Sequence, residues 1–236
     1  MLKIAICEDS ASERERLKQQ LRDTELFEGA QYCCYADGKQ LIEAVQGGEY
    51  FDIAFLDIDM PLVNGIEAAK RISRASKECL IIFVTAYPQY AIQAFDCNAF
   101  NYVLKNDGYD RLYSVALKAM EKYKALHGIY RIGTKDEIIN LKVSDICYIE
   151  CLGKHLVFHT CEDEYTVRGK ISEALTRLCA FGFCQCHQGY IVNMEKITRI
   201  DKYSIMLDDG SQVPVSVRKR AEFLKLYNDY IGRYLV

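Results

Sequence analysis

Side chains that could do chemistry follow short apolar segments in the first half of the chain. Asp57 ends the apolar run 51–56, and Asp59 and Pro61 come directly after it. The run lacks polar alternation, which is typical of a parallel strand covered on both faces by helices. Ligand crevices of open α/β sheets lie outside the carboxyl ends of such strands, so Asp57 is predicted to lie at a ligand-binding or catalytic site. The alternative is that Asp57 only caps the next turn.

Acidic, hydroxyl and amine groups follow three other apolar segments in the same way. They are Glu8, Asp9, Thr85 and Lys105. Carboxylates held close together repel one another unless a cation neutralises them, and Mg²⁺ suits oxygen ligands. With Mg²⁺, Lys105 and Thr85 on phosphoryl oxygens, Asp57 could be the attacking carboxylate of a phosphoryl transfer. The pattern therefore predicts an aspartyl phosphate.

Strands that alternate with helices are needed to bring these groups together. The predicted strands are 2–7, 31–36, 51–56, 80–85 and 100–104. The predicted helices begin after Ser10, where Glu13 has capping-box spacing, and continue at 39–46, 65–73, 89–95 and 110–126. This alternation predicts right-handed βαβ units and an α/β, doubly wound, five-stranded parallel domain over residues 1–124.

The first 124 residues or so resemble the receiver domain of two-component response regulators. The resemblance is carried by Glu8 and Asp9, by Asp57 through Pro61 with Gly65, by Thr85 with its neighbours, and by Tyr102 through Lys105. It implies a flavodoxin-like fold, with Asp57 as phosphoacceptor for a partner sensor histidine kinase.

The same resemblance implies further roles and shows two departures. Mg²⁺ would be held by Glu8, Asp9, Asp57 and the backbone carbonyl of Asp59. Thr85 and Lys105 would sense the phosphoryl group, and Tyr102 would be the switch aromatic, unless it is a half-buried strand tyrosine without that role. The family often has proline after the lysine, where this chain has Asn106, and Glu8-Asp9 replaces the commoner pair of aspartates.

A phosphatase is the enzyme alternative. Asp57 and Asp59 also match the Asp-x-Asp motif of haloacid-dehalogenase-type phosphatases, which place their further acids downstream. In this chain the further acids are upstream, at residues 8 and 9, while Asp208 and Asp209 fall in a predicted β-turn. The chain is therefore predicted to be a regulator and not an enzyme.

The second half changes to short β-rich segments. A short linker is predicted at 125–129, because the last helix of the first half ends at Gly128. The predicted strands are 130–132, 138–142, 146–150, 155–160, 165–168, 190–192, 197–201, 204–207 and 212–215. Helices are predicted at 171–179 and at about 218–231. This arrangement predicts a mostly antiparallel β domain over residues 130–236.

This half resembles the LytTR DNA-binding domain of one branch of response regulators. The match is carried by residues 146–155, by 186–193 with Ile197, and by 213–218. The resemblance implies loops that reach double-stranded DNA at direct-repeat promoter sites, and a homodimer when the protein is phosphorylated or bound to DNA. The residues that would face the duplex are Lys154, His155, His187, Gln188, Arg218 and Lys219. Their side chains suit base edges and phosphates.

Composition sets limits on other functions. The chain has 236 residues, of which 50% are hydrophobic, a net charge of −3 and 11 cysteines. No apolar run could span a bilayer and no export signal is visible, so a cytoplasmic protein with reduced thiols and no membrane partner is expected. Zinc binding or redox sensing at Cys184, Cys186 and His187 is an alternative, although strand alternation puts His187 on the other face. A module that binds protein or RNA remains a rival, because this half is not strongly basic.

Overall fold

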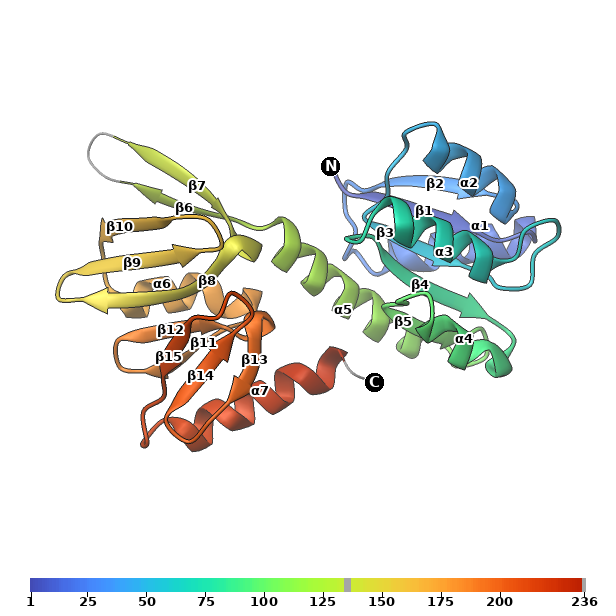
Figure 1. Ribbon diagram of the computed structural model, residues 1–236. Helices are drawn as coiled ribbons and strands as arrows, with labels where there is room; N and C mark the ends of the chain where they lie inside the picture. The colour runs from blue at the N-terminus through green and yellow to red at the C-terminus, as the bar shows by residue number, and fades with distance from the viewer. Residues whose placement is uncertain (134–136, 235–236) are drawn as a thin grey trace. The chain divides into compact units, whose positions relative to one another are not determined.

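The computed structural model describes residues 1–133 and 137–234, which form two units divided between Met120 and Glu121 (Figure 1). The elements of the first unit are β1 (Lys3–Cys7), α1 (Ala11–Asp23), β2 (Gln31–Tyr35), α2 (Gly38–Gln46), β3 (Ile53–Leu56), α3 (Gly65–Ala75), β4 (Leu80–Thr85), η1 (Pro88–Tyr90), α4 (Ala91–Phe95), β5 (Asn101–Leu104) and the first part of α5 (Tyr109–His127). The residues of α5 from Glu121 onward belong to the second unit. The five strands are parallel, in the order β2-β1-β3-β4-β5. The predicted doubly wound α/β fold is confirmed.

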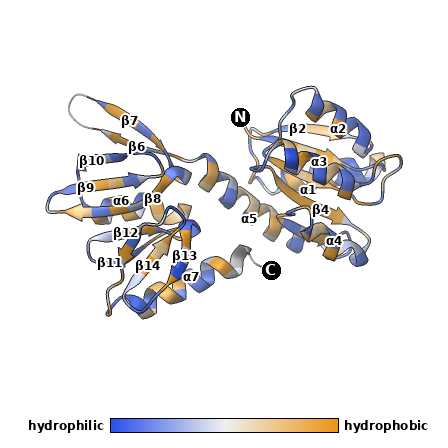
Figure 2. Cartoon of the chain, in the orientation of Figure 1, coloured by the Kyte–Doolittle hydropathy of each residue, from blue (hydrophilic) through white to orange (hydrophobic). Residues whose placement is uncertain are grey.

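The central strands of the first sheet are buried on both faces, as their unbroken apolar sequences require. Every residue of β3 and β4 is buried. Figure 2 shows β4 as hydrophobic along its length, whereas α3 alternates between hydrophilic and hydrophobic residues. One face of the sheet packs against α2, α3 and α4, which bury Leu41, Ile72 and Ala94. Packing of this kind fixes the height of each strand, and hence where each strand end projects.

Local signals explain where the helices begin. The N-caps Ser10, Asp37 and Asn64 each accept a hydrogen bond from the backbone N–H three residues later. The capping-box prediction is only half right, because the Glu13 carboxylate bonds Arg16 and not the Ser10 N–H. The helix predicted at 89–95 is split into η1 and α4, since Pro88 starts a 3₁₀ turn.

The second unit is built on antiparallel strands. Its elements after α5 are β6 (Ile129–Gly133), β7 (Ile138–Lys142), η2 (Val143–Asp145), β8 (Ile146–Leu152), β9 (His155–Thr160), β10 (Glu164–Arg168), α6 (Ile171–Leu178), η3 (Cys179–Phe181), β11 (Phe183–His187), β12 (Tyr190–Asn193), η4 (Met194–Lys196), β13 (Ile197–Ile200), β14 (Ser204–Leu207), β15 (Gln212–Pro214) and α7 (Arg220–Tyr234). The described sheets have the orders β10-β9-β8-β12-β11, β13-β14-β15 and β6-β7. The mostly antiparallel prediction is confirmed.

The five-stranded antiparallel sheet carries a core on each face. One core joins it to α6 through Ala174 and Leu178, and the other joins it to β14 and α7 through Ile205 and Phe223. The predicted linker 125–129 overlapped the predicted helix 110–126, and the helix holds, because α5 continues to His127 and β6 begins at Ile129. No helix in the described ranges is long and apolar enough to cross a membrane.

Candidate functional site

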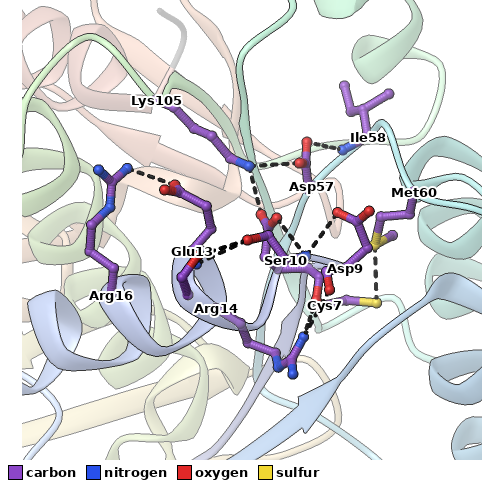
Figure 3. Close-up of polar contacts among 12 residues, drawn as sticks. Cys7, Asp9, Ser10, Glu13, Arg14, Arg16, Asp57, Ile58, Met60 and Lys105 are labelled. Carbon is purple, nitrogen blue, oxygen red and sulfur yellow. Dashed lines mark hydrogen bonds and ion pairs between the residues drawn. The ribbon is translucent and has the colours of Figure 1, made fainter.

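Four of the predicted strand-end residues of the first unit, Glu8, Asp9, Asp57 and Lys105, meet in one cluster. Figure 3 labels Asp9, Asp57 and Lys105 of this cluster. Oxygen atoms of Glu8, Asp9 and Asp57 all lie within 4.8 Å of one another. Lys105 Nζ lies 2.7 Å from Asp57 Oδ2 and 2.7 Å from Glu8 Oε2. Glu8 is only 2% exposed and Asp57 only 6% exposed. One ammonium thus faces two buried carboxylates, and the cluster keeps an excess of negative charge that suits a divalent cation.

Backbone hydrogen bonds fix the orientation of Asp57. Its N–H donates to the Cys7 carbonyl at 2.8 Å, which ties β3 to β1 at the site. Its Oδ1 accepts the Ile58 N–H at 2.6 Å, while Oδ2 takes the Lys105 contact. Gly65 passes so close that a Cβ there would lie 2.0 Å from the Asp57 carbonyl oxygen. Glycine is therefore required where α3 begins.

The acidic pair that follows β1 is positioned by Ser10, which precedes the first helix, and by Arg14, which the sequence analysis did not single out. The Ser10 N–H donates to Glu8 Oε1 at 3.3 Å and to Asp9 Oδ1 at 3.0 Å. Arg14 Nη1 donates to the Glu8 carbonyl at 2.6 Å. The available signal was an arginine on the first turns of the helix that directly follows the acids. These contacts hold the loop after β1 against α1.

Burial and charge shift the pKa values of two cluster members. Burial raises the pKa of Glu8, although the hydrogen bond from Lys105 lowers it. For Lys105, burial lowers the pKa, but the hydrogen bonds to Asp57 and Glu8 outweigh it, so the net pKa is raised. Lys105 therefore keeps its charge at neutral pH.

Thr85 brings a hydroxyl to the same edge of the sheet. It ends β4, is fully buried, and its Oγ1 has no hydrogen-bond partner within residues 1–133 and 137–234. A buried hydroxyl of this kind is costly unless a ligand completes it. The Thr85 hydroxyl, at the same sheet edge as the acidic cluster, is therefore available to donate a hydrogen bond to an anionic oxygen of a ligand.

Two other predicted residues lie near Thr85 and Asp57. Tyr102 is half-buried on β5; its hydroxyl donates to the Tyr87 carbonyl, and its ring is 6.1 Å from that of Phe83. Asp59 is exposed, and its carboxylate hydrogen-bonds the Tyr87 hydroxyl, which raises the pKa of Tyr87. The Lys105–Asn106 peptide is trans.

Two hairpin turns of the second unit carry four of the predicted DNA-facing residues. Leu152 pairs with His155, so Gly153 and Lys154 form the β8–β9 turn, and Gly153 has a positive φ of 64°. Across the β11–β12 turn, His187 pairs with Tyr190, and Gln188 lies at the tip.

The two turns lie side by side at one end of the sheet. β8 pairs with β12, and the Cys151 N–H donates to the Gly189 carbonyl at 2.8 Å. Lys154, His155 and Gln188 are exposed there. His187 is half-buried and its Nδ1 accepts the Gly189 N–H at 3.3 Å. The structure thus gathers two turns that are distant in sequence, since even His155 and His187 are 32 positions apart.

The segment before α7 joins the same end of the sheet. The Ser216 N–H donates to the Cys186 carbonyl at 3.0 Å. Lys219 Nζ donates to Gln185 Oε1 at 2.6 Å, and the Gln185 amide donates to the Gln188 carbonyl at 3.1 Å. Arg218 is exposed, but α7 begins at Arg220, so the prediction that Arg218 starts the helix is wrong by two residues. Sequence reasoning also missed that Lys219 has a partner within the chain.

The zinc alternative finds no support among the residues that the structure describes. Cys184 and Cys186 are buried in a hydrophobic core, and no metal-ligand cluster includes them. Burial raises the pKa of Cys184 to about 11 and that of Cys186 to about 12. Both thiols therefore stay protonated at neutral pH.

Comparisons with known proteins agree with this division of the chain. The response regulator receiver domain family matches residues 4–116, and the LytTr DNA-binding domain family matches residues 136–228. The sensory transduction protein LytT of Bacillus cereus is 27% identical, over 96% of this chain and 99% of that protein. The transcriptional regulatory protein YpdB of Escherichia coli is 27% identical, over 95% of this chain and 99% of that protein. The response regulatory domain of mrkE from Klebsiella pneumoniae, a crystal structure, is 26% identical and covers 52% of this chain and 98% of its own, with a TM-score of 0.48.

Proposed function

Since the chain belongs to the response regulators that join a receiver domain to a LytTr DNA-binding domain, we propose that a partner histidine kinase phosphorylates it on Asp57. Phosphorylation then controls sequence-specific binding to direct-repeat promoter sites. The observation that carries this proposal is the cluster in which the buried Glu8 and Asp57 and the exposed Asp9 meet Lys105.

The cluster has the groups that a phosphoryl transfer needs. Glu8, Asp9 and Asp57 would hold Mg²⁺ through carboxylate oxygens, with the backbone carbonyl of Asp59 as a further ligand. Bound Mg²⁺ supplies neutralisation of the negative charge on the phosphoryl oxygens. Asp57 attacks the phosphorus of a phosphohistidine; a P–O bond forms, the P–N bond breaks, and the imidazole leaves. Ile58 N–H and Lys105 hold the two Asp57 oxygens in place for this attack.

The new phosphoryl group is read by Thr85 and Lys105. The Thr85 hydroxyl, which is buried without a partner among the described residues, donates to one phosphoryl oxygen. The Lys105 ammonium leaves the Asp57 carboxylate and forms an ion pair with a second phosphoryl oxygen. Tyr102, whose ring lies on the adjacent strand, then changes its position as the segment after Thr85 moves. These changes shift a pre-existing equilibrium of the receiver domain.

The shifted receiver pairs with a second copy through the region of α4. Ile92 is 79% exposed and Phe95 is 77% exposed there. Large apolar side chains this exposed are suited to a protein contact. Two linked DNA-binding domains then occupy two half-sites together, and their joint affinity exceeds that of either domain alone.

The two turns and the segment before α7 form the proposed DNA surface. Arg218 can bond a guanine edge with two N–H groups, and Gln188 can bond adenine. Lys154 and His155 contact phosphates or bases from the β8–β9 turn, with His187 beside them. Lys219 can keep its bond to Gln185 and still offer N–H donors to a phosphate.

Phosphorylation with acetyl phosphate and Mg²⁺ tests the acceptor. Asp57→Asn should form no hydroxylamine-sensitive acyl phosphate, whereas wild type should. Asp59→Asn is the matched control and should still be phosphorylated, because only its backbone carbonyl is assigned a role. Acyl phosphate on Asp57→Asn, detected by intact mass, would show that the acceptor is misassigned.

A further inference from the structure

Two cysteine thiols of the second unit lie in contact outside the proposed DNA surface. Cys147 Sγ and Cys161 Sγ are 3.7 Å apart. Cys147 is fully buried, whereas Cys161 is exposed. A disulfide requires an S–S distance of about 2.05 Å. To form a bond, the two sulfur atoms therefore have to move closer only by the difference between these two distances.

Local backbone structure permits this approach. The β8–β9 register shifts between Ile146 and Tyr148, so Cys147 is an extra residue at an irregularity of the strand. Such a residue is left out of the ladder, and its backbone can adjust without breaking paired hydrogen bonds. Cys161 follows the last residue of β9, and its N–H donates to the Asp145 carbonyl at 3.0 Å. Backbone contacts thus keep the two cysteines together.

A cation stands beside the exposed thiol. Lys196 Nζ lies 3.5 Å from Cys161 Sγ and 3.5 Å from Asp208 Oδ2. Burial lowers the pKa of Lys196, but electrostatic interactions with Cys161, Asp208 and Cys147 outweigh burial. The net pKa of Lys196 is therefore raised, and its charge is kept. An ammonium beside a reacting sulfur can stabilise the negative charge that passes to the leaving group. For Cys147, burial and the hydrogen bond with Cys161 raise the pKa, so that thiol stays protonated.

We propose that Cys147 and Cys161 form a reversible, peroxide-driven disulfide, with Cys161 as the thiol that reacts first and Cys147 as the thiol that resolves it. The Cys161 thiolate attacks one oxygen of a hydroperoxide. An S–O bond forms, the O–O bond breaks, and the released hydroxide or alkoxide takes up a proton. Cys161 is then a sulfenic acid, oxidised by two electrons.

The second step closes the bond. Cys147 attacks the Cys161 sulfur, the S–S bond forms, the S–O bond breaks, and the hydroxide leaves as water with the proton of Cys147. Two thiols and one hydroperoxide thus give one disulfide, one water and one further water or alcohol. The bond joins the start of β8 to the β9–β10 turn and encloses the β8–β9 hairpin. Dithiol reductants reverse it by thiol–disulfide exchange.

Peptide mapping of the full chain tests the bond directly. The folded protein is treated with hydrogen peroxide, alkylated, and digested with trypsin. We expect the peptide 143–154 to be linked to the peptide 155–168, and the link to disappear after dithiothreitol. The oxidised protein should also unfold at a temperature higher by roughly 5 °C, since the cross-link restricts the unfolded chain. Absence of this linked pair from oxidised, folded wild type would overturn the proposal.

Three variants assign the roles. Cys161→Ser should abolish the link, and because Cys161 is exposed this change should not affect folding. Cys151→Ser is the matched control, because Cys151 lies in the same tryptic peptide as Cys147; the link should persist. Lys196→Gln should slow peroxide consumption by roughly tenfold, and Lys196→Arg should restore the rate. An unchanged rate in Lys196→Gln, or loss of the link in Cys151→Ser, would contradict the assignment.

Discussion

The two halves of the molecule present their functional side chains in opposite ways. In the receiver domain, Glu8, Asp57 and Thr85 are buried, and their orientation follows from backbone contacts of neighbouring strands. In the DNA-binding domain, Lys154, Gln188 and Arg218 are exposed on turns. A buried charge must be held by fixed partners or it is too costly to keep. An exposed one can be changed without loss of the fold, so the proposed DNA specificity can vary there while the proposed phosphorylation site stays constant.

The largest effect should come from crowding the buried site. Gly65→Ala should lower the free energy of unfolding by about 3 kcal/mol and slow phosphorylation, because its Cβ would lie 2.0 Å from the Asp57 carbonyl oxygen. Chemical denaturation and acetyl phosphate labelling measure the two. Gly232→Ala, where a Cβ would meet nothing within 4 Å, is the control and should be neutral or slightly stabilising. If Gly65→Ala and Gly232→Ala are equally stable, the buried site is no more sensitive to an added methyl group than the exposed surface is.

At the exposed surface, a substitution should change binding and spare the fold. Arg218→Ala should weaken operator binding by about 1–3 kcal/mol, or roughly fivefold to 150-fold, at unchanged unfolding temperature. The salt dependence of binding should be steep in wild type and shallower in the variant. Lys142→Ala removes an exposed charge on β7, away from the turns, and should bind as wild type does. A shallow salt slope in wild type would favour a protein or RNA partner over DNA.

A smaller change of opposite sign is expected at Thr85. Thr85→Val should raise the free energy of unfolding of the unphosphorylated protein by about 1 kcal/mol, since it removes a buried hydroxyl that has no partner among the described residues. It should also abolish the gain in DNA affinity on phosphorylation. Thr24→Val is the matched control: Thr24 Oγ1 donates to the Leu21 carbonyl at 2.6 Å, so its loss should destabilise the fold. Destabilisation by both changes would mean that Thr85 is already satisfied.

The smallest effect concerns pH. Burial raises the pKa of Glu8 above that of an ordinary glutamate, so its carboxylate becomes protonated at a higher pH as the solution is acidified. Mg²⁺ binding needs the ionised form. Mg²⁺ affinity, measured by calorimetry, should therefore begin to fall at a higher pH than an unshifted glutamate would cause. Glu8→Gln should bind Mg²⁺ more weakly and lose this part of the pH dependence; an identical pH profile would exclude Glu8 as the titrating group.

The same contrast explains what could be predicted from the sequence. The strand-end positions of Asp57, Thr85 and Lys105 were correctly grouped, because parallel strands without polar alternation allow only one edge for their carboxyl ends. The turns at Lys154 and Gln188 were also placed correctly. Their relation to each other depends on the pairing of β8 with β12, which periodicity does not specify.

Contacts made by the ends of long side chains could not be predicted from the sequence. Arg14 bonds the Glu8 carbonyl, and Lys219 bonds Gln185 across 34 positions, although many partners were available to either side chain. The contact between Cys147 and Cys161 depends on a shift of register within β8, and no residue type in that strand marks it. Such features arise from three-dimensional packing and not from local propensity.

The junction at Gly128 determines how the two domains could be exchanged between proteins. A Cβ at Gly128 would lie 2.9 Å from the Phe181 ring and 3.1 Å from Val143, and Lys122 on α5 forms an ion pair with Glu195. The last turns of α5 thus pack as part of the second unit, which begins at Glu121. A chimaera that keeps another receiver should therefore be cut between Met120 and Glu121. A cut after His127, where α5 ends, would remove from the second unit the residues from Glu121 onward that pack within it.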